Sequence, residues 1–151
     1  MQQLKGDRCC EIYYAINGEE KEYKMTNEFH SDFSFNYELR NNYLYVLVSG
    51  PKDDFDISNK LWKDIYAKTV ELGVHRILVE EDFPNQLTTI ETYRIAEIIS
   101  KMFKGNVKIA HVDQHKIYES LNKFGETEAV NRGLLVKIFN NITDGEKWLI
   151  K

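Results

Sequence analysis

Residues 75–112 read HRILVEEDFPNQLTTIETYRIAEIISKMFKGNVKIAHV, and this stretch decides the fold. At one end HRILVEE (75–81) contains a continuous apolar run, which indicates a strand. At the other end NVKIAHV (106–112) is interpreted as another strand. The sequence therefore predicts two strands, separated by a segment that is long enough to hold a helix.

The segment between these strands carries the signals of that helix. Thr88 and Glu91 have the spacing of a capping box, in which each side chain satisfies a free backbone N–H at the helix start. This predicts a helix over 88–103 that ends at Gly105. Its inward-facing residues are Ile95, Ile98, Ile99 and Met102. A strand, a helix and a strand in this order predict a parallel pair with a right-handed crossover.

Before this unit the sequence predicts a hairpin and another helix. FSFNYEL (33–39) alternates apolar and polar residues as a half-buried strand does, and YLYVLVS (43–49) follows after Asn41-Asn42. Apolar residues recur at helical spacing over 56–72, and Gly73 comes directly after them. We therefore expect an antiparallel hairpin followed by a helix that packs on the sheet.

After this unit the sequence predicts two further helices and a last strand. HKIYESLNKF (115–124) is interpreted as a helix that ends at Gly125, and LLVKIF (134–139) as the last strand. Thr143 and Glu146 repeat the capping-box spacing, which predicts a short final helix. The apolar residues that would dock this helix are Ile142, Trp148 and Leu149.

The alternation of strands and helices predicts an α/β domain over 33–151, with an antiparallel hairpin leading into parallel strands. Residues 1–32 are more polar and are interpreted as an N-terminal extension. Within the extension, CEIYYAI, the turn-forming pair Asn17-Gly18 and EEKEYKM predict a β-hairpin. A chain of 151 residues suits one domain, which can bury a core without a disulfide or a structural metal.

Composition and motifs point away from several classes of protein. A net charge of −4 without a basic block argues against nucleic acid as a partner. No apolar run approaches the ~20 residues of a transmembrane segment, and the N-terminus lacks the apolar core of a signal peptide. A disulfide between adjacent Cys9 and Cys10 would be strained, so we expect free thiols and a cytoplasmic location. Nucleophile-elbow, P-loop and dinucleotide-binding motifs are absent. This favours a non-enzymatic function over an enzymatic one, and we expect no cofactor.

The end of the chain, GETEAVNRGLLVKIFNNITDGEKWL (125–149), resembles the SpoIIAA-like proteins of the STAS superfamily, as does the order of the predicted elements. The matching positions are Glu126, Asn131, Arg132, Gly133, Phe139, Trp148 and Leu149. The resemblance covers about residues 33–151. It implies a STAS-like mixed β-sheet of four to five strands with helices packed mainly on one face, and it implies a function in protein binding.

The better-known relatives are anti-sigma-factor antagonists, which bind a kinase and are switched by phosphorylation of a Ser in an Asp-Ser-Ser-Gly motif at the start of the second helix. EEDFPNQLTTIET (80–92) stands at that place here, and no Gly follows its hydroxyl residues. Thr88 and Thr89 are therefore the candidate phosphoacceptors, because helix N–H groups would stabilise a phosphate there. The alternative is that Thr88 is an N-cap and Thr89 the first helical residue.

The same loop carries a candidate partner-binding surface, because an apolar pair on an acidic loop can contact another protein. The proposed contact residues are Phe83, Pro84, Leu87, Thr88 and Thr89, joined by Asp54 from the preceding loop. The alternative is that Phe83 folds back over the second helix. Arg132, oriented by Asn131, is a candidate anion-binding residue, with a local Glu126–Arg132 pair as the plainer explanation.

Acidic and histidine side chains follow three strands of the predicted sheet, where the carboxyl ends of parallel strands usually bind ligands. They are Asp53, Asp54 and Asp56, then Glu80, Glu81 and Asp82, then His111, Asp113 and His115. Carboxylates suit Mg²⁺ or Ca²⁺ and histidines suit Zn²⁺. The candidate metal ligands are Asp53, Asp54, Asp82, His111 and His115. The alternative is that these acids complement helix dipoles or keep the loops solvated.

Taken with the resemblance, these features predict a non-enzymatic regulatory or adaptor protein that acts through protein–protein interaction. The alternative is a small-ligand or divalent-metal-binding domain that uses the acidic rim. A third hypothesis is an apolar ligand pocket under the helices, which the similarity of this fold to lipid-carrying domains implies. Aromatic residues of the first hairpin, if they share one open face, predict a homodimer or a small apolar pocket there. They are Phe33, Phe35, Tyr43 and Tyr45.

Overall fold

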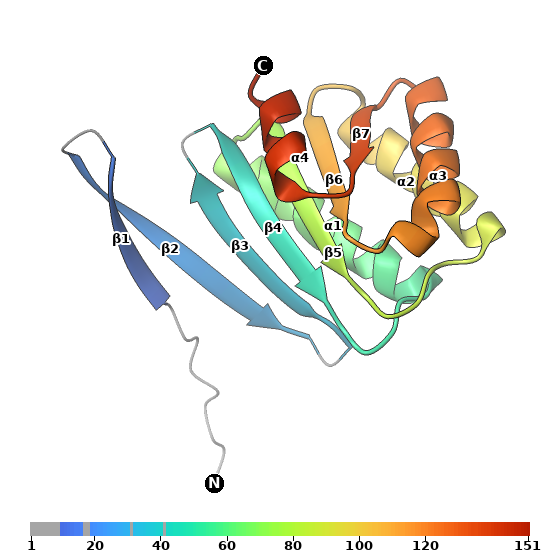
Figure 1. The fold of residues 1–151 in the computed structure, drawn as a ribbon, viewed down its shortest axis with the longest axis horizontal. Helices are drawn as coiled ribbons and strands as arrows, with labels where there is room; N and C mark the ends of the chain where they lie inside the picture. The colour runs from blue at the N-terminus through green and yellow to red at the C-terminus, as the bar shows by residue number, and fades with distance from the viewer. Residues whose placement is uncertain (1–9, 17–18, 31, 41) are drawn as a thin grey trace, which may run out of the picture.

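A computed structural model describes residues 10–16, 19–30, 32–40 and 42–151 and shows a mixed β-sheet covered by helices (Figure 1). The strands are β1 (Cys10–Ile16), β2 (Glu19–Phe29), β3 (Ser34–Arg40), β4 (Tyr43–Ser49), β5 (Arg76–Asp82), β6 (Lys108–Asp113) and β7 (Leu135–Phe139). They lie side by side in sequence order. Neighbours from β1 to β4 are antiparallel, and neighbours from β4 to β7 are parallel. The predicted α/β fold with a mixed sheet is confirmed, since β3 to β7 form its five-stranded part.

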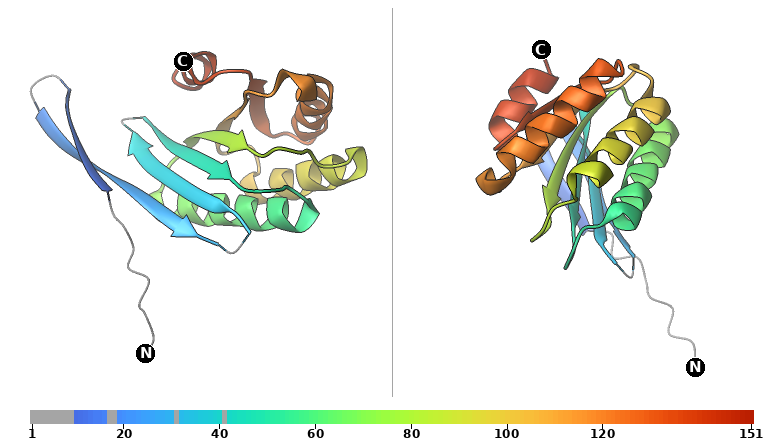
Figure 2. Two further views of the ribbon diagram at one scale, coloured as in Figure 1. Left: turned by 60° about the horizontal axis from the view of Figure 1, so that its bottom comes forward. Right: turned by 90° about the vertical axis from the view of Figure 1, so that its right-hand side faces the viewer.

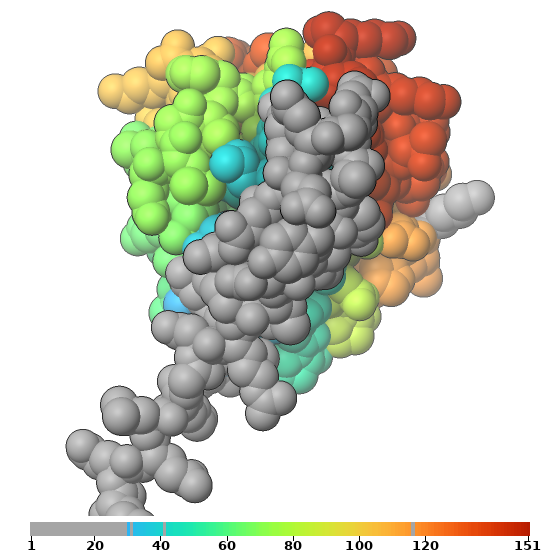
Figure 3. Space-filling model, turned by 90° about the vertical axis from the view of Figure 1, so that its left-hand side faces the viewer, coloured from blue at the N-terminus to red at the C-terminus, as the bar shows by residue number. Residues whose placement is uncertain are grey.

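Helices cover the two faces of the sheet unequally (Figure 2). On one face lie α1 (Phe55–Leu72), α2 (Thr89–Phe103) and α3 (Glu119–Asn131), with the 3-10 turn η1 (Lys116–Tyr118) leading into α3. On the other face lies α4 (Ile142–Leu149). The green end of α1 and red α4 accordingly stand on opposite sides of the molecule in Figure 3. The prediction that the helices pack mainly on one face is confirmed.

The central strands are apolar on both faces because both faces are covered. The larger core, under α1 to α3, includes Phe35, Leu44, Val46, Ile77, Val79, Ile109, Leu61, Trp62, Ile65, Ile95, Ile99 and Phe103. The smaller core, under α4, consists of Tyr43, Tyr45, Leu78, Ala110, Val112 and Leu149, with Phe139, Ile142 and Trp148 packed against it. The final helix therefore docks through the apolar residues that the sequence predicts for it.

The aromatic residues of the first hairpin face opposite sides of the sheet. Phe35 pairs with Val48, and Glu38 pairs with Tyr45. Because cross-strand partners share a face, this register places Phe35 in the larger core and Tyr45 in the smaller one. Phe33 likewise packs in the larger core, and Tyr43 packs in the smaller one. The prediction that these residues share one open face is wrong, and the homodimer or pocket inferred from that face loses its basis.

The helix α3 does not end at Gly125, as the sequence predicts, but continues to Asn131. A Cβ atom at Gly125 would lie 3.0 Å from Thr92 Cγ2 of α2. The glycine therefore marks a close approach of two helices rather than a helix end. Gly133, with a φ of 89°, takes the left-handed conformation just beyond α3.

One of the two predicted capping boxes is present. The Thr88 side chain accepts from the Glu91 N–H, and the Glu91 carboxylate accepts from the Thr88 N–H. The predicted box of Thr143 with Glu146 is wrong, because α4 begins two residues earlier than that box requires. Its N-cap is Asn141, which accepts a hydrogen bond from the Asp144 N–H at 2.9 Å.

The backbone of the N-terminal segment extends the sheet. β1 and β2 pair from Cys10 with Met25 to Ile16 with Glu19, and residues 26–29 of β2 continue onto β3. The predicted turn at Asn17-Gly18 and the predicted thiol state of Cys9 lie outside the described residues. Within the described ranges, no helix is long and apolar enough to span a membrane.

Candidate functional site

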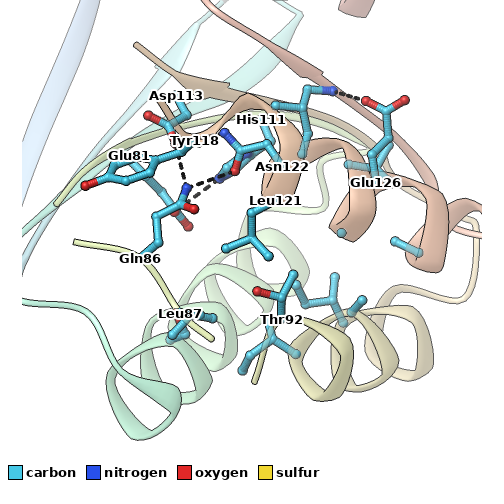
Figure 4. Close-up of a pocket in the computed structure, with 18 of the residues that line it drawn as sticks. Glu81, Gln86, Leu87, Thr92, His111, Asp113, Tyr118, Leu121, Asn122 and Glu126 are labelled. Atoms are coloured by element: carbon cyan, nitrogen blue, oxygen red, sulfur yellow. Dashed lines mark hydrogen bonds and ion pairs between the residues drawn. The ribbon is translucent and has the colours of Figure 1, made fainter. Parts of the chain in front are cut away.

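A partly open cavity of about 130 Å³ lies between the sheet and helices α1, α2 and α3 (Figure 4). Most of its wall is apolar, because strands and helices present their core faces there. The apolar lining is Trp62, Phe83, Leu87, Ile95, Ala96, Ile99, Ile109, Leu121, Ala129, Leu134, Val136 and Ile138. Protein interiors rarely leave a space much larger than a water molecule, so a space of this size marks a candidate binding site.

One end of the cavity is polar, and β5 and β6 place its acids. Glu81 and Asp113 are register partners at the carboxyl ends of these parallel strands. Side chains alternate along a strand, so Glu81, His111 and Asp113 point to the same face as the apolar residues under the helices. The neighbouring acid Glu80 points the other way, where it accepts hydrogen bonds from Tyr45 and Gln114.

His111 is a buried ionisable residue at this end and pairs with an acid. The residue is only 9% exposed, and its Nε2 lies 3.3 Å from Glu81 Oε2. Burial alone would lower the pKa of His111, but the charge and hydrogen bond of Glu81 outweigh this effect and raise it. Its Nδ1 is buried and, within the described part of the chain, has no hydrogen-bond partner.

Asp53 brings a third carboxylate to the cavity from the loop between β4 and α1. Both of its oxygens lie 2.9 Å from Ser58 Oγ of α1. Burial, and next the negative charge of Glu81, raise the pKa of Asp53 to about 7, although the Ser58 hydroxyl opposes the shift. A carboxyl group that titrates near neutrality inside a cavity is a common feature of functional sites.

The amide of Asn85 holds the loops on either side of this carboxylate together. Its Oδ1 accepts from the Asp53 N–H at 2.8 Å, and its Nδ2 donates to the Asp53 carbonyl at 2.8 Å. The Asn85 side chain thus pairs with the backbone N–H and carbonyl of Asp53, which lies in a loop and has no backbone partner in the sheet. This contact fixes the loops after β4 and β5 relative to each other, and with them the position of Asp53.

Half-buried polar side chains close the polar end on the side of α3 (Figure 4). Asn122 donates to Asp113 Oδ2 at 2.9 Å, and Gln86 donates to Asn122 Oδ1 at 3.3 Å. The Tyr118 hydroxyl donates to the carbonyl of Pro84 at 2.8 Å. These bonds join the loop after β5 to the start of α3 and frame the acidic end of the cavity.

Only some of the residues predicted to bind a partner are exposed. Phe83 is only 4% exposed, and its ring packs in the larger core beside Gly50, so the prediction of an exposed Phe83 is wrong. Leu87 is half buried and lines the cavity. Pro84, Thr88 and Thr89 are exposed. Asp54 is the N-cap of α1 and accepts from the Ile57 N–H at 2.9 Å. Partner binding by the exposed residues stays a prediction.

The five predicted metal ligands are not brought together. Asp53 and His111 line the cavity, whereas Asp54 caps α1. Asp82 and His115 form a separate exposed pair, with 3.4 Å between Oδ1 and Nε2. Among the residues described by the structure, no group of three or more histidines, cysteines and acids is arranged to hold a metal ion.

The predicted phosphoacceptors and anion site are also placed by the structure. Thr88 serves as the N-cap of α2, and Thr89 is its first residue, so phosphoacceptance stays a prediction. Arg132 pairs with Glu128, at 2.7 Å, and stacks over the Tyr93 ring. The predicted Glu126–Arg132 pair is wrong, since Glu126 instead accepts from the Ile138 N–H of β7. Asn131 is exposed at the end of α3.

Sequence reasoning finds three of the acids at the polar end but misses the neutral polar residues around them. The missed residues are Ser58, Asn85, Gln86 and Asn122. Ser58 lies one helical turn after the Asp54 cap, which is a usable signal because it places the hydroxyl over the preceding loop. Asn85 and Asn122 become partners only through the crossover connections, and no local pattern predicts their contacts.

No protein-family model matches this chain, and no curated protein matches it in sequence.

Proposed function

We propose that this protein binds a small organic molecule in the cavity between its parallel strands and helices α1 to α3. The observation that carries this proposal is a space of about 130 Å³ with apolar walls and one polar end. A bound ligand would cover apolar walls that are otherwise in contact with solvent, which is favourable, and the polar end would orient it.

The buried ionisable groups support the same proposal. Asp53 and His111 both have pKa values displaced from their usual ranges, and both line the cavity. Such groups reduce the stability of a core that has no use for them, because charges and unpaired polar atoms are costly to bury. Their position at the carboxyl ends of parallel strands is where ligands of open α/β sheets usually bind.

A thermal-shift screen of small organic molecules tests this function. Binding stabilises the folded protein, by about 2.7 kcal/mol at a ligand concentration 100 times Kd. The Ala129→Leu variant adds side-chain volume at a residue that lines the cavity, whereas Val130→Leu adds volume at the exposed neighbouring position on α3. We expect ligands that stabilise wild type and Val130→Leu but not Ala129→Leu. Stabilisation of all three proteins alike would contradict binding in the cavity.

The adaptor function, and membership of the SpoIIAA-like family that suggests it, remain proposals from the sequence resemblance. Their support is the mixed sheet with helices mainly on one face, and a loop that exposes Pro84, Thr88 and Thr89. Affinity capture with wild type beside Thr88→Glu tests this function. A partner that both proteins retain would place the contact elsewhere than at the start of α2.

A further inference from the structure

The charges that line the cavity have one sign. Glu81 and Asp113 lie at its polar end, and Glu126 lies further along the wall (Figure 4). Asp53 also lines the cavity, close enough to Glu81 for their charges to interact. Among the described lining residues there is no lysine and no arginine. His111 is the single lining group there that can become positive, and Glu81 already pairs with it. This distribution repels carboxylates and phosphates and attracts cations.

The hydrogen-bonding capacity of the acids is unevenly used. Asp113 accepts at both oxygens, from the His115 N–H and from the Asn122 amide, each at 2.9 Å. Glu81 Oε2 lies 3.3 Å from His111 Nε2, whereas Glu81 Oε1 has no hydrogen-bond partner in the part of the chain that the structure describes. Glu81 thus keeps an acceptor for a donor that the protein does not provide.

His111 adds a second, independent indication. The residue is buried and lines the cavity, yet its Nδ1 is without a partner among the described residues. A buried polar atom of this kind is costly unless a polar partner reaches it. The open position at Nδ1 therefore indicates that a ligand brings polar atoms to this end, and the free oxygen of Glu81 calls for a ligand that donates a hydrogen bond.

The apolar part limits the size of the ligand. An engineered apolar cavity of about 150 Å³ in another protein binds benzene, so a space of about 130 Å³ suits a body of about that size. Thr92, Leu87 and Leu121 lie along this part, away from the acids (Figure 4). A short branched or aromatic group fills it, and a long acyl chain does not.

We propose that the ligand of this cavity is a small organic amine, whose ammonium group is held by Glu81 and whose apolar body lies between α2, α3 and the sheet. The ammonium group supplies the donors that the polar end lacks and the positive charge that its acids attract. This inference rests on the proposed small-ligand function and specifies the chemical class that the site takes.

Titration calorimetry of the full chain with benzylamine, benzyl alcohol and benzoate tests the inference. These probes share a ring and differ in the charge of one substituent. We expect benzylamine to bind at least about tenfold more tightly than benzyl alcohol, because a charge-assisted bond to Glu81 is made by the amine alone. We expect benzoate to bind more weakly than the alcohol.

Two charge-neutralising variants on neighbouring residues provide the control. Glu81→Gln removes the charge inside the cavity, and we expect it to weaken benzylamine binding about tenfold while changing benzyl alcohol binding less than about twofold. Glu80→Gln removes a charge on the opposite face of β5 and should leave both affinities unchanged. Glu81→Asp keeps the charge and should keep the preference for the amine. This second variant keeps the inference testable if Glu81→Gln fails to fold.

The outcomes distinguish the amine inference from the proposed binding of a small molecule. Equal affinity for benzylamine and benzyl alcohol, or an equal loss of both in Glu81→Gln, would overturn the amine inference and leave ligand binding in place. No saturable heat with any of the three probes up to about 10 mM would overturn the amine inference together with the proposed function.

Discussion

Asn85 and Asp53 exchange two hydrogen bonds across the loops that follow β5 and β4, with 2.8 Å between donor and acceptor in each. One side-chain amide satisfies both backbone groups of a residue whose carboxylate faces the cavity. The polar end of the cavity is thus built from two loops that a single side chain fixes together.

Removal of this amide should loosen both loops. We expect Asn85→Ala to lower the free energy of unfolding by about 1 kcal/mol, because two partly buried backbone groups of Asp53 lose their partner. We also expect weaker binding of any cavity ligand, since Asp53 would no longer be held in place. Urea unfolding monitored by fluorescence measures the first effect. Asn131→Ala, at an exposed position, is the matched control, and an equal loss in both variants would contradict the role of Asn85.

Stability should depend on pH through Asp53. Its pKa is about 7 in the folded protein and near 3.8 when unfolded, so the folded state binds more protons between these values. The free energy of unfolding should therefore fall as pH rises from about 4 to about 7, by up to roughly 4 kcal/mol for a shift of about three pKa units. The raised pKa of His111 acts in the same direction, because its stabilisation is lost as pH rises through the folded value.

The Asp53→Asn variant isolates this dependence. We expect it to be more stable than wild type at about pH 8, with the difference shrinking as pH falls below the unfolded-state pKa near 3.8, where the wild-type carboxyl becomes protonated in both states. Urea unfolding at several pH values measures the difference. Asp56→Asn, at an exposed acid in the first turn of α1, should be slightly less stable than wild type at pH 8. A stability of Asp53→Asn below wild type at pH 8 would contradict the raised pKa.

The approach of α3 to α2 at Gly125 predicts a coupling between two helices. In a helix interior, Gly→Ala is worth about 1 kcal/mol, but here the new Cβ would lie 3.0 Å from Thr92 Cγ2. We expect Gly125→Ala to stabilise the protein in a Thr92→Ser background, which lacks that methyl group, and to be less favourable in wild type by about 0.5–1 kcal/mol. A double-mutant cycle measures this coupling. Additive effects would show that the helices do not meet at this point.

The capping box of α2 can be tested at Thr88. We expect Thr88→Ala to cost about 1 kcal/mol and Thr88→Asp to be nearly neutral, because Asp is also a good N-cap. Thr89→Ala, at an exposed position one residue further, should change stability by less than about 0.5 kcal/mol. Thermal unfolding of the three variants measures these differences. If Thr89→Ala is the more damaging change, the assigned helix start is wrong.

The fold was largely predictable because its signals are local. The apolar run at 77–79, the apolar residues of 109–112, the Thr88–Glu91 box and the closing Gly73 each lie within one element or at its end. Gly125 misleads because its role is set by Thr92, which is distant in sequence. The face of the first hairpin was misassigned because the register of Phe35 with Val48 depends on the turn between the strands.

The candidate site was predictable in its location but not in its chemistry. Parallel strands bring Glu81 and Asp113 to the same edge of the sheet, as their positions at strand ends predict. The sequence does not reveal which side of the sheet each acid faces until the register of the strand is known. Glu80 and Glu81 are adjacent, yet one contacts Tyr45 outside the cavity and the other contacts His111 inside it.

The measurement that tests the central claim most directly is an amide NMR titration of the isotope-labelled protein with a small amine such as benzylamine. Binding in the cavity predicts saturable shifts at Ile109, His111 and Ala129, which line it, with little change at Leu39 and Asn42 on the hairpin. The same shifts should be absent in Ala129→Leu and retained in Val130→Leu. Shifts that do not saturate, or that centre on the hairpin or on α4, would contradict the assignment of this cavity as the binding site.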